Sequence, residues 1–278
     1  MEVREIETII ESIAGDSSSG ASELVRESHR CIEKLVSALE KGHLGEENVL
    51  AWLEKLALAR REMVPIGNLV SIFTEEAGDF SGDGVERGLA RIRVAISEEE
   101  EIPEKISRDI EPLFHGDASR ILVYSYSSTV CRVLANLCGK ARITVMTSEG
   151  RPTGDGARLL EKLGDVEIAF EMHTDAGLMS GAGGADIAFF GTDGWSDNYF
   201  VNKTGTKALV QILDIHGKNA FVFASPLKKA DDETLLALSF PHHDFAEWLP
   251  HPPERVTVKN PHFEVIPRYP NVTLFGGK

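Results

Sequence analysis

The chain is poor in features that mark several common protein classes. It has only three cysteines, Cys31, Cys131 and Cys138, and their odd number and irregular spacing suit neither a disulfide framework nor a metal site. No apolar run approaches the ~20 residues that cross a bilayer. The charged, amphipathic start MEVREIETII does not resemble a signal peptide. We therefore expect reduced thiols, a cytoplasmic location and no membrane partner.

Positive charge is also scarce. The 278 residues include 29 Lys and Arg against 44 Asp and Glu, a formal net charge of −15. This balance argues against a nucleic-acid groove, so no direct nucleic-acid partner is expected. The negative net charge does not exclude a pocket that is locally positive and binds a small anion. With 42% hydrophobic and 26% charged residues, the composition is typical of a globular chain with a large core, in one large domain or two smaller ones.

Several chemical signatures are missing. No G-x-G-x-x-G follows an apolar run, SGAGGAD precedes one instead, and there is no Walker motif, so we expect no nicotinamide and no other cofactor. YSYSSTVC contains serines but no G-x-S-x-G elbow. The segment PHHDFAEWLPHPPE gathers His242, His243, Asp244 and His251, but their spacing matches no closed zinc pattern. The expectation there is solvated histidines and no metal.

The first part of the chain has apolar residues at helical spacing. Gly15 and Gly42 are expected to end the first two helices, and Pro103 the last. The pattern predicts a helical domain over residues 1–112, as a bundle or layered helix pairs. The helical segments are EVREIETIIESIA, SGASELVRESHRCIEKLVSALEKG, ENVLAWLEKLALARREM, IGNLVSIFTEEA and GVERGLARIRVAISEEEE.

From residue 113 onward, short apolar runs alternate with amphipathic segments. The runs begin at Arg120, Arg142, Val166, Ala185 and Asn219, and a late extended stretch, NVTLFGG, could add an edge strand. Alternation at a step of roughly 22 residues is typical of successive βαβ units with right-handed crossovers. Burial on both faces explains why these runs lack a polar–apolar alternation. Residues 113–278 are therefore predicted to form an α/β domain with a Rossmann-like, doubly wound parallel sheet.

Polar and charged side chains follow the predicted strands. In an open parallel sheet, ligands bind beyond the carboxyl ends of the strands. Two cations, Arg151 and Lys203, together with hydroxyls at helix N-termini favour a phosphate site there. The alternative is that these residues only cap helices, for which Ser127, Ser128 and Asp175 are well suited. The residues after the strands are Ser125, Tyr126, Ser127 and Ser128, then Thr147, Ser148, Glu149 and Arg151, then His173 and Asp175, then Asp193, Asn202 and Lys203.

Four segments carry a resemblance to one family: YSYSSTVCRVL, TSEGRPTGDGARLLEKL, GTDGWSDNYFVNKTGT and NPHFEVIP. They resemble, in turn, the hAYSrvVlrVL signature, the T/S-E-x-x-P segment, the G-A-D/E…NKIGT turn and the N-P-x-F-D-x-T-P segment of the regulatory α/β/δ subunits of eukaryotic initiation factor 2B. The blocks are scattered from about Ile121 to about Pro267, and the NK-x-GT turn is the most specific. The helical part is similar in layout only. The same superfamily includes isomerases of methylthioribose-1-phosphate and ribose-1,5-bisphosphate.

The resemblance implies which residues form a site. The isomerases shuttle a proton between a cysteine and an aspartate; the aspartate position is Asp193 here, and the cysteine position falls on Tyr126. Tyrosine, with a free pKa near ~10, is a poorer shuttle than a thiol near ~8.5. Ser19 stands where the isomerases have a phosphate-binding arginine. The substrate-contacting positions that persist are Glu149, Arg151, Asn202 and Lys203.

Three functions stay open on these residues. The first is a non-catalytic initiation factor 2B-like subunit that binds a sugar phosphate or nucleotide. The second is an aldose–ketose isomerase in which Asp193 moves the proton, assisted by Tyr126 or Ser125. The third is a structural relative with a decayed pocket. The expected partners are a phosphorylated small molecule and either a second copy in a homodimer or related subunits. The expected binding residues are Ser125, Ser127, Glu149, Arg151, Asn202, Lys203, Gly205 and Thr206.

Overall fold

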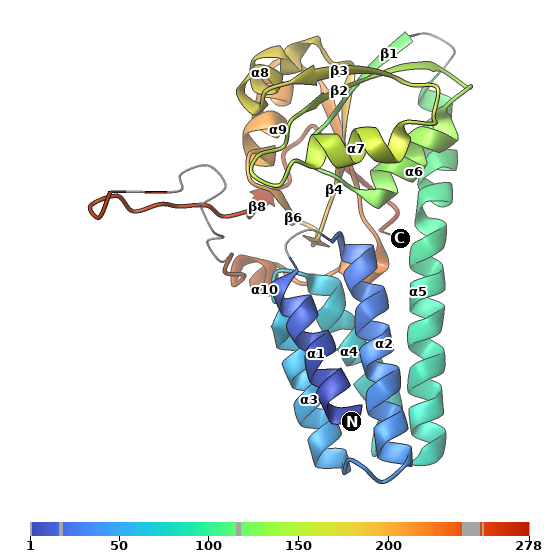
Figure 1. The fold of residues 1–278 in the computed structure, drawn as a ribbon. Coiled ribbons are helices and arrows are strands. Elements are labelled where there is room, and N and C mark those ends of the chain that lie inside the picture. Colours follow the sequence, from blue (N-terminus) through green and yellow to red (C-terminus); the bar gives the residue numbers. More distant parts are fainter. Residues whose placement is uncertain (1, 17–18, 115–117, 241–250, 252, 278) are drawn as a thin grey trace. The chain divides into compact units, whose positions relative to one another are not determined.

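The chain divides into two units in the computed structural model, which describes residues 2–16, 19–114, 118–240, 251 and 253–277. One unit, called the helical unit below, comprises Met1–Glu101 with Pro226–Lys229. The other, the α/β unit, comprises Ile102–Ser225 and Ala230–Lys278 (Figure 1).

Amphipathic helices build the helical unit, as the sequence predicts. α1 turns Ile6, Ile10 and Ile13 inward at helical spacing, and none is more than 3% exposed. At the start of α2, the Glu23 carboxylate accepts a hydrogen bond from the backbone N–H of Gly20 at 3.0 Å, which caps the helix. The helices are α1 (Glu2–Gly15), α2 (Ala21–Glu40), α3 (Glu46–Ala59), α4 (Val64–Ala77) and the first part of α5 (Gly82–Ile110).

Pro103 does not end the last of these helices, contrary to the sequence-based expectation. It lies inside α5, which continues to Ile110. An interior proline costs a helix about 3 kcal/mol. Beyond it, Ile106 and Ile110 continue the apolar face that starts at Ile102, and all three are at most 4% exposed in the core of the α/β unit. Full burial of each isoleucine contributes about 1.5–3 kcal/mol, so the packed face outweighs the proline.

Six strands among the described residues form one parallel sheet, in the order β3-β2-β1-β4-β7-β9. Counted along the sheet alone, this is the 3-2-1-4-5-6 order of doubly wound folds, so the predicted α/β architecture is confirmed. The late stretch NVTLFGG supplies the edge strand β9. The strands are β1 (Ala118–Val123), β2 (Arg142–Ser148), β3 (Ala169–His173), β4 (Ile187–Gly191), β7 (Asn219–Phe223) and β9 (Val272–Phe275).

Helices cover both faces of this sheet (Figure 1). Along β1, Ile121 and Val123 pack into a cluster with α6, α7 and the end of α5, whereas Leu122 and Tyr124 pack into a cluster with α8 and α9. The alternation of side chains along a strand therefore feeds two cores at once. The remaining elements are η1 (Glu111–Leu113), α6 (Ser128–Leu137), α7 (Asp155–Leu163), α8 (Asp175–Gly181), η2 (Ala182–Gly184), α9 (Thr206–Ile215), η3 (Pro226–Lys228) and α10 (Asp232–Leu236).

A second, antiparallel sheet was not predicted. The sequence suggested only a strand-to-helix turn after Gly191, but the chain there forms β5 (Gly194–Trp195) and β6 (Tyr199–Lys203). β5 pairs with β6, and β6 pairs in turn with the distant β8 (Phe263–Pro267). Trp195 anchors the turn by donating its indole N–H to the Ser225 carbonyl at 2.7 Å. In the β6–β8 ladder, Asn202 lies opposite Glu264. This small sheet therefore carries part of the predicted site.

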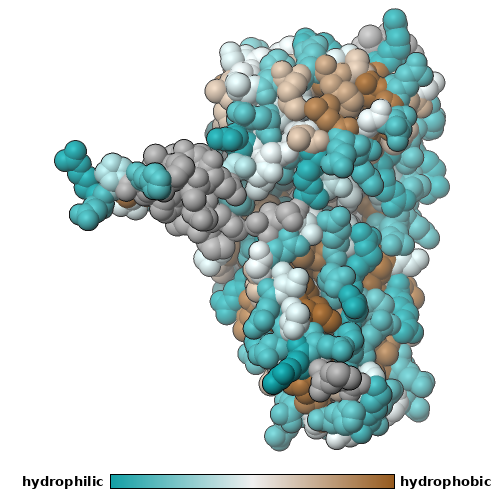
Figure 2. Space-filling model, viewed as in Figure 1, coloured by the Kyte–Doolittle hydropathy of each residue, from teal (hydrophilic) through white to brown (hydrophobic). Residues whose placement is uncertain are grey.

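Hydrophilic residues predominate on the face drawn in Figure 2, and apolar residues form patches both over the α/β unit and over the helical unit. That surface agrees with the charged fraction of 26%. Within the described ranges, every helix is either too short or too polar to cross a membrane.

Candidate functional site at the carboxyl edge of the sheet

The strand order reverses between β1 and β4, and this switch point is where doubly wound sheets bind ligands. Ser125, just after β1, has φ = 77°, a left-handed conformation that is uncommon outside glycine and asparagine. Ser127 caps α6 by accepting a hydrogen bond from the Val130 N–H at 3.3 Å, so the capping role predicted for it is present. A Cβ added at Gly191, the last residue of β4, would lie 2.6 Å from Ser127 Oγ. The predicted residues after β1 therefore lie beside the end of β4, which leads into Asp193.

The turn after β2 is held by Asp175 from α8. Its carboxylate accepts hydrogen bonds from Ser148 Oγ at 2.6 Å, from the Gly150 N–H at 3.0 Å and from the Arg151 N–H at 2.9 Å. Asp175 is therefore not the N-cap of α8 that the sequence suggested. Thr174 caps that helix instead, because its hydroxyl accepts from the Gly177 N–H. The Asp175 carboxylate instead bonds to the turn after β2, and these hydrogen bonds fix the backbone at Arg151.

Lys203 reaches this same turn from the end of β6. Its ammonium donates to Thr153 Oγ1 at 2.9 Å and lies 3.0 Å from Asp155 Oδ2. Ser125 Oγ donates to the same Asp155 oxygen at 3.1 Å. The side chains are buried, with 4% of Lys203 and 12% of Asp155 exposed. Segments that follow β1, β2 and β6 thus meet at one buried ion pair.

Asp155 can reach this point because α7 starts very close to β2. A Cβ at Gly156 would lie 1.9 Å from the Ser148 carbonyl oxygen, so only glycine allows the approach. Asp155 also accepts from Thr153 Oγ1 at 2.9 Å, in the first turn of the helix. A negative side chain there is favoured by the helix dipole.

The N-terminus of α9 is occupied by a carboxylate of the chain itself. Glu264 Oε1, from β8, accepts hydrogen bonds from the Gly205 N–H at 2.8 Å and the Lys207 N–H at 3.0 Å. The Thr206 hydroxyl donates to the Lys203 carbonyl at 2.7 Å. Tyr124 donates its phenol to the Thr204 carbonyl at 2.9 Å, which ties this turn to the end of β1.

These carboxylates produce a negative field around Tyr124. Burial raises the pKa of the Tyr124 phenol most, and the charges of Asp175, Asp155 and Glu264 raise it further. The phenol therefore stays protonated and keeps its role as a hydrogen-bond donor across the physiological range. Three aspartate and glutamate side chains act on it from three different elements, α7, α8 and β8.

Arg151, Glu149 and Asn202 differ in their surroundings. Arg151 and Glu149 are exposed, and the described part of the chain provides no side-chain hydrogen bond or ion pair to either. Asn202 is 4% exposed, and its Nδ2 has no hydrogen-bond acceptor within the described part of the chain. Because successive side chains in a strand point to opposite faces, Asn202 and Lys203 leave β6 on different sides.

Asp193 is half-buried, and its backbone N–H donates to the Val201 carbonyl at 3.0 Å. Tyr126, to which the family resemblance assigns the position of the isomerase cysteine, lies with its ring centroid 4.2 Å from the Arg158 guanidinium carbon. The nearby thiol, Cys131, points into the core: it is 2% exposed, and burial raises its pKa from 9.0 to about 12. At neutral pH, Cys131 is therefore a protonated core residue.

Sequence reasoning placed Lys203 in the site but missed its partners. Thr153 and Asp155 lie within the quoted segment TSEGRPTGDGARLLEKL, and Glu264 lies within NPHFEVIP. The carboxylates of Asp155 and Glu264 are visible in the sequence, but their contacts are not. The approach of Asp155 to Lys203 depends on a close helix–strand contact, and Glu264 reaches the amides of α9 from a strand about 60 residues away. Tyr124 falls within the predicted apolar run that begins at Arg120, and the pattern does not indicate what its phenol contacts.

No group of three metal-ligating side chains occurs among the residues that the structure describes. The histidine-rich segment with His242, His243 and Asp244 lies outside them, and His251 is exposed. The site at the sheet edge contains carboxylates, hydroxyls, an amide and two cations, a set suited to hydrogen-bonding a polar metabolite.

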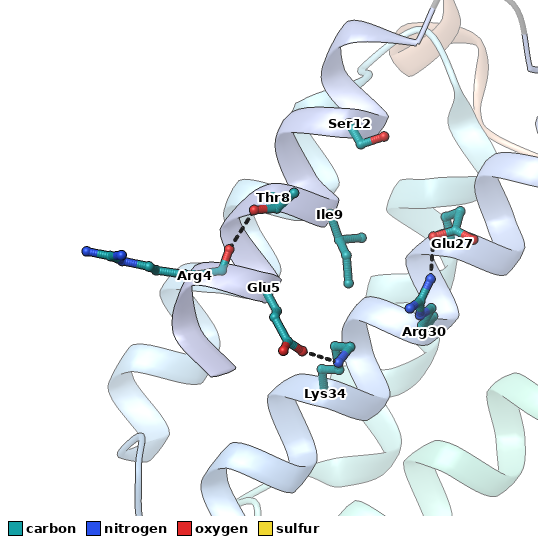
Figure 3. A pocket seen from close by; sticks show the side chains of 8 residues that line it. All are labelled: Arg4, Glu5, Thr8, Ile9, Ser12, Glu27, Arg30 and Lys34. Carbon is teal, nitrogen blue, oxygen red and sulfur yellow. Dashed lines mark hydrogen bonds and ion pairs between the residues drawn. The ribbon is translucent and has the colours of Figure 1, made fainter. Parts of the chain in front are cut away.

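A hollow of about 830 Å³ lies on the helical unit between α1 and α2 (Figure 3). Its cations have acidic neighbours: Lys34 pairs with Glu5 at 2.5 Å, and Arg30 Nη1 lies 3.6 Å from Glu27. Figure 3 shows the Arg4 side chain pointing away from the other lining residues. This arrangement offers no converging charge for an anion, so the sheet edge is the better candidate.

Curated proteins with similar sequences fall into two groups. The chain is 29% identical over 207 residues to a Pyrococcus furiosus protein described as translation initiation factor eIF-2B subunit 2-like, a match that covers 72% of this chain and 71% of that protein. It is also 29% identical over 226 residues to a methylthioribose-1-phosphate isomerase of Pelotomaculum thermopropionicum. That match covers 77% of this chain but only 59% of the isomerase.

Solved structures show the same fold. The translation initiation factor eIF-2B of Pyrococcus horikoshii OT3 superposes with a TM-score of 0.78 at 22% identity, over 95% of this chain and 91% of that one. A chain of the tetrameric eIF2B-beta2-delta2 complex of C. thermophilum gives a TM-score of 0.66 at 20% identity, over 83% and 80%. The family resemblance read from the four segments is confirmed, because the sequence model of the initiation factor 2 subunit family matches residues 2–269. The chain belongs to the initiation factor 2 subunit family.

Proposed function

We propose that the chain is a ligand-binding subunit of the initiation factor 2B type, which holds a phosphorylated small molecule at the carboxyl edge of its sheet without efficient catalysis. The ligand would be a sugar phosphate or a nucleotide. The observation that carries the proposal is the lack of a usable thiol at the switch point among the described residues. The family resemblance assigns the position of the isomerase cysteine to Tyr126. Cys131 is buried, and burial raises its pKa to about 12.

The contacts of Tyr126 also oppose a shuttling role. Its ring lies against the Arg158 guanidinium, which makes it a packing partner for a cation. Loss of a matched acid/base typically costs ~10²–10⁴ in rate, whereas binding needs no such group. A binding role is therefore consistent with the residues that remain.

Arg151 is the proposed receiver of the ligand's anionic group. Its guanidinium is exposed, and its backbone is fixed by the Asp175 carboxylate. A planar guanidinium suits bidentate binding of phosphate. Ser125, Ser127, Glu149, Asn202, Lys203, Gly205 and Thr206 are proposed to line the rest of the site.

The test is an activity assay combined with thermal shift. Purified protein is incubated with methylthioribose-1-phosphate and with ribose-1,5-bisphosphate, and product is followed by ³¹P NMR. We expect turnover at least ~10²-fold below that of an active isomerase measured in parallel. A ligand at 100 times its Kd should still stabilise the protein by about 2.7 kcal/mol. Turnover close to the active isomerase would reject the proposal.

An isomerase is the second candidate, favoured by one observation. Asp193 persists and lies two residues after Gly191, the residue that packs against Ser127 at the switch point. If turnover is found, Asp193→Asn should abolish it. Activity that survives this substitution would exclude Asp193 as the proton carrier.

We also propose that the protein assembles through the last strands, as a homodimer or with related subunits. β9 pairs with β7 alone among the described strands, which leaves its outer edge available for a partner. Light scattering coupled to size exclusion should report about twice the chain mass of 30.4 kDa. A single species at the chain mass would contradict a homodimer.

A further inference from the structure

Three positions at the sheet edge that could receive an anion already contact carboxylates of the chain. Lys203 faces Asp155 at 3.0 Å. The N–H groups of Gly150 and Arg151 donate to Asp175. The amides that open α9 donate to Glu264. A phosphate that entered at any of these three points would therefore meet a carboxylate in the place it needs.

Of these three carboxylates, Asp155 should affect anion binding most, because it forms an ion pair with the full positive charge of Lys203. Its side chain is 12% exposed, and it accepts hydrogen bonds from Ser125 and Thr153 in addition to the ion pair with Lys203. Those two hydroxyls hold Asp155 Oδ1 and Oδ2 in place, so the carboxylate is not positioned to swing away at low cost. In so buried a site, screening by water and salt is weak. A phosphate oxygen within hydrogen-bonding distance of Lys203 would be repelled by Asp155.

From this geometry we propose that Asp155 is a specificity-determining residue: it neutralises Lys203 and so reserves the interior of the site for uncharged hydroxyl groups. The inference rests on the proposed function and narrows its ligand class. The ligand carries one anionic group, which faces Arg151 at the exposed rim, and a hydroxyl-bearing part, which faces Lys203 and Asp155. A second phosphate on the ligand would gain no stabilising contact at the Lys203 end, because Asp155 already balances that charge.

The experiment compares Asp155→Asn with the wild-type protein, using orthophosphate, ribose 5-phosphate and ribose 1,5-bisphosphate as probes at constant ionic strength. Affinities are measured by calorimetry and thermal shift. We expect the wild-type protein to bind the bisphosphate no more than ~3-fold more tightly than the monophosphate. Asp155→Asn should bind orthophosphate and the bisphosphate at least ~10-fold more tightly than wild type. Adding Lys203→Met to Asp155→Asn should cancel that gain.

Asp165→Asn is the matched control. Asp165 is exposed just beyond α7, so this variant removes one negative charge from the same unit without touching Lys203. Its phosphate affinity should equal that of wild type, which separates a local effect from a change in net charge. Asp155→Ser provides a second route if Asp155→Asn folds poorly, since serine retains an acceptor in the first turn of α7.

The outcomes separate the two proposals. Unchanged or weaker phosphate binding by both Asp155 variants would overturn the role of Asp155, even if wild type binds a monophosphate. A wild-type protein that binds none of the probes would refute the proposed function. If Asp155→Asn nevertheless gained phosphate binding through Lys203, the role of Asp155 as the counter-charge would stand.

Discussion

Breaking the buried pair of Lys203 and Asp155 should destabilise the protein far more than breaking an exposed pair. At 3.0 Å and an effective dielectric constant of about 20, the Coulomb attraction is about 5.5 kcal/mol. Desolvation offsets much of it, but removing one partner leaves the other charge buried. Lys203→Met and Asp155→Asn should each therefore cost about 3–5 kcal/mol. For a unit of this size, a loss of about 3 kcal/mol lowers Tm by roughly 6–12 °C.

The assay is a double-mutant cycle followed by urea unfolding. The double variant Lys203→Met/Asp155→Asn leaves no unpaired charge, so it should be less destabilised than the sum of the single variants by about 2–3 kcal/mol. The pair of Lys140 and Glu111, with side chains 44% and 42% exposed, provides a matched control in the same unit. Its coupling energy should be below about 1 kcal/mol. Equal coupling in the two cycles would refute the claim that burial makes the Lys203–Asp155 pair special.

Three further predictions follow from the site and its core. In the folded protein at pH 8, a thiol reagent should label the half-buried Cys138 well before Cys31 and Cys131, which are 0% and 2% exposed; rapid labelling of all three would contradict the core placement. Because the pKa of Cys131 rises from 9.0 to about 12 on folding, its contribution to stability is complete below pH ~9 and is lost as pH rises toward 12; a variant Cys131→Ala should show a shallower loss over that window, and an identical slope would be inconsistent with the shift. Glu264→Gln should lower the free energy of unfolding by about 0.5–2 kcal/mol in a urea titration, since a neutral amide accepts more weakly from the amides of α9; no change would mean that the charge at this helix end is unimportant.

The main strands and helices could be predicted from the sequence because each one produces a local pattern of apolar and polar residues. Apolar runs beginning at Arg120 and Arg142 predict strands, and amphipathic segments between such runs predict crossover helices. The right-handed crossovers expected for such units agree with helices on both faces of the sheet, whereas the strand order itself is seen only in the structure. Both faces are buried, which matches the near-continuous hydrophobicity of the runs.

The features that the sequence did not predict depend on contacts between distant residues. β6 and β8 pair across about 60 residues, and no local pattern in the sequence indicates that pairing. β5 has only two residues, which is too short to show an alternating pattern. Pro103 has the sequence signature of a helix end, but Ile106 and Ile110 keep α5 intact through packing. Tertiary burial wins over local propensity there.

In the candidate site, too, some residues could be predicted from the sequence, and others depend on contacts between distant residues. Lys203 was predicted by its position after a strand and by the family resemblance, and the structure places it in a buried hydrogen-bonding network. Its counter-ion Asp155 belongs to α7, distant from Lys203 in the sequence, and is brought close by Gly156, so the charge balance of the site is seen only in the structure. The Arg151 turn meets Lys203 through Thr153 and Asp155, while the Arg151 guanidinium itself stays exposed.

A calorimetric titration of the purified protein with ribose 5-phosphate and with adenosine monophosphate tests the central claim most directly. The account predicts saturable binding of at least one of these monophosphates, with affinity reduced at least ~10-fold in Arg151→Met and unchanged in Arg142→Met, an exposed arginine at the opposite end of β2. No saturable heat with either compound at millimolar concentration, or equal binding by Arg151→Met, would contradict a phosphate-binding site at the carboxyl edge of the sheet.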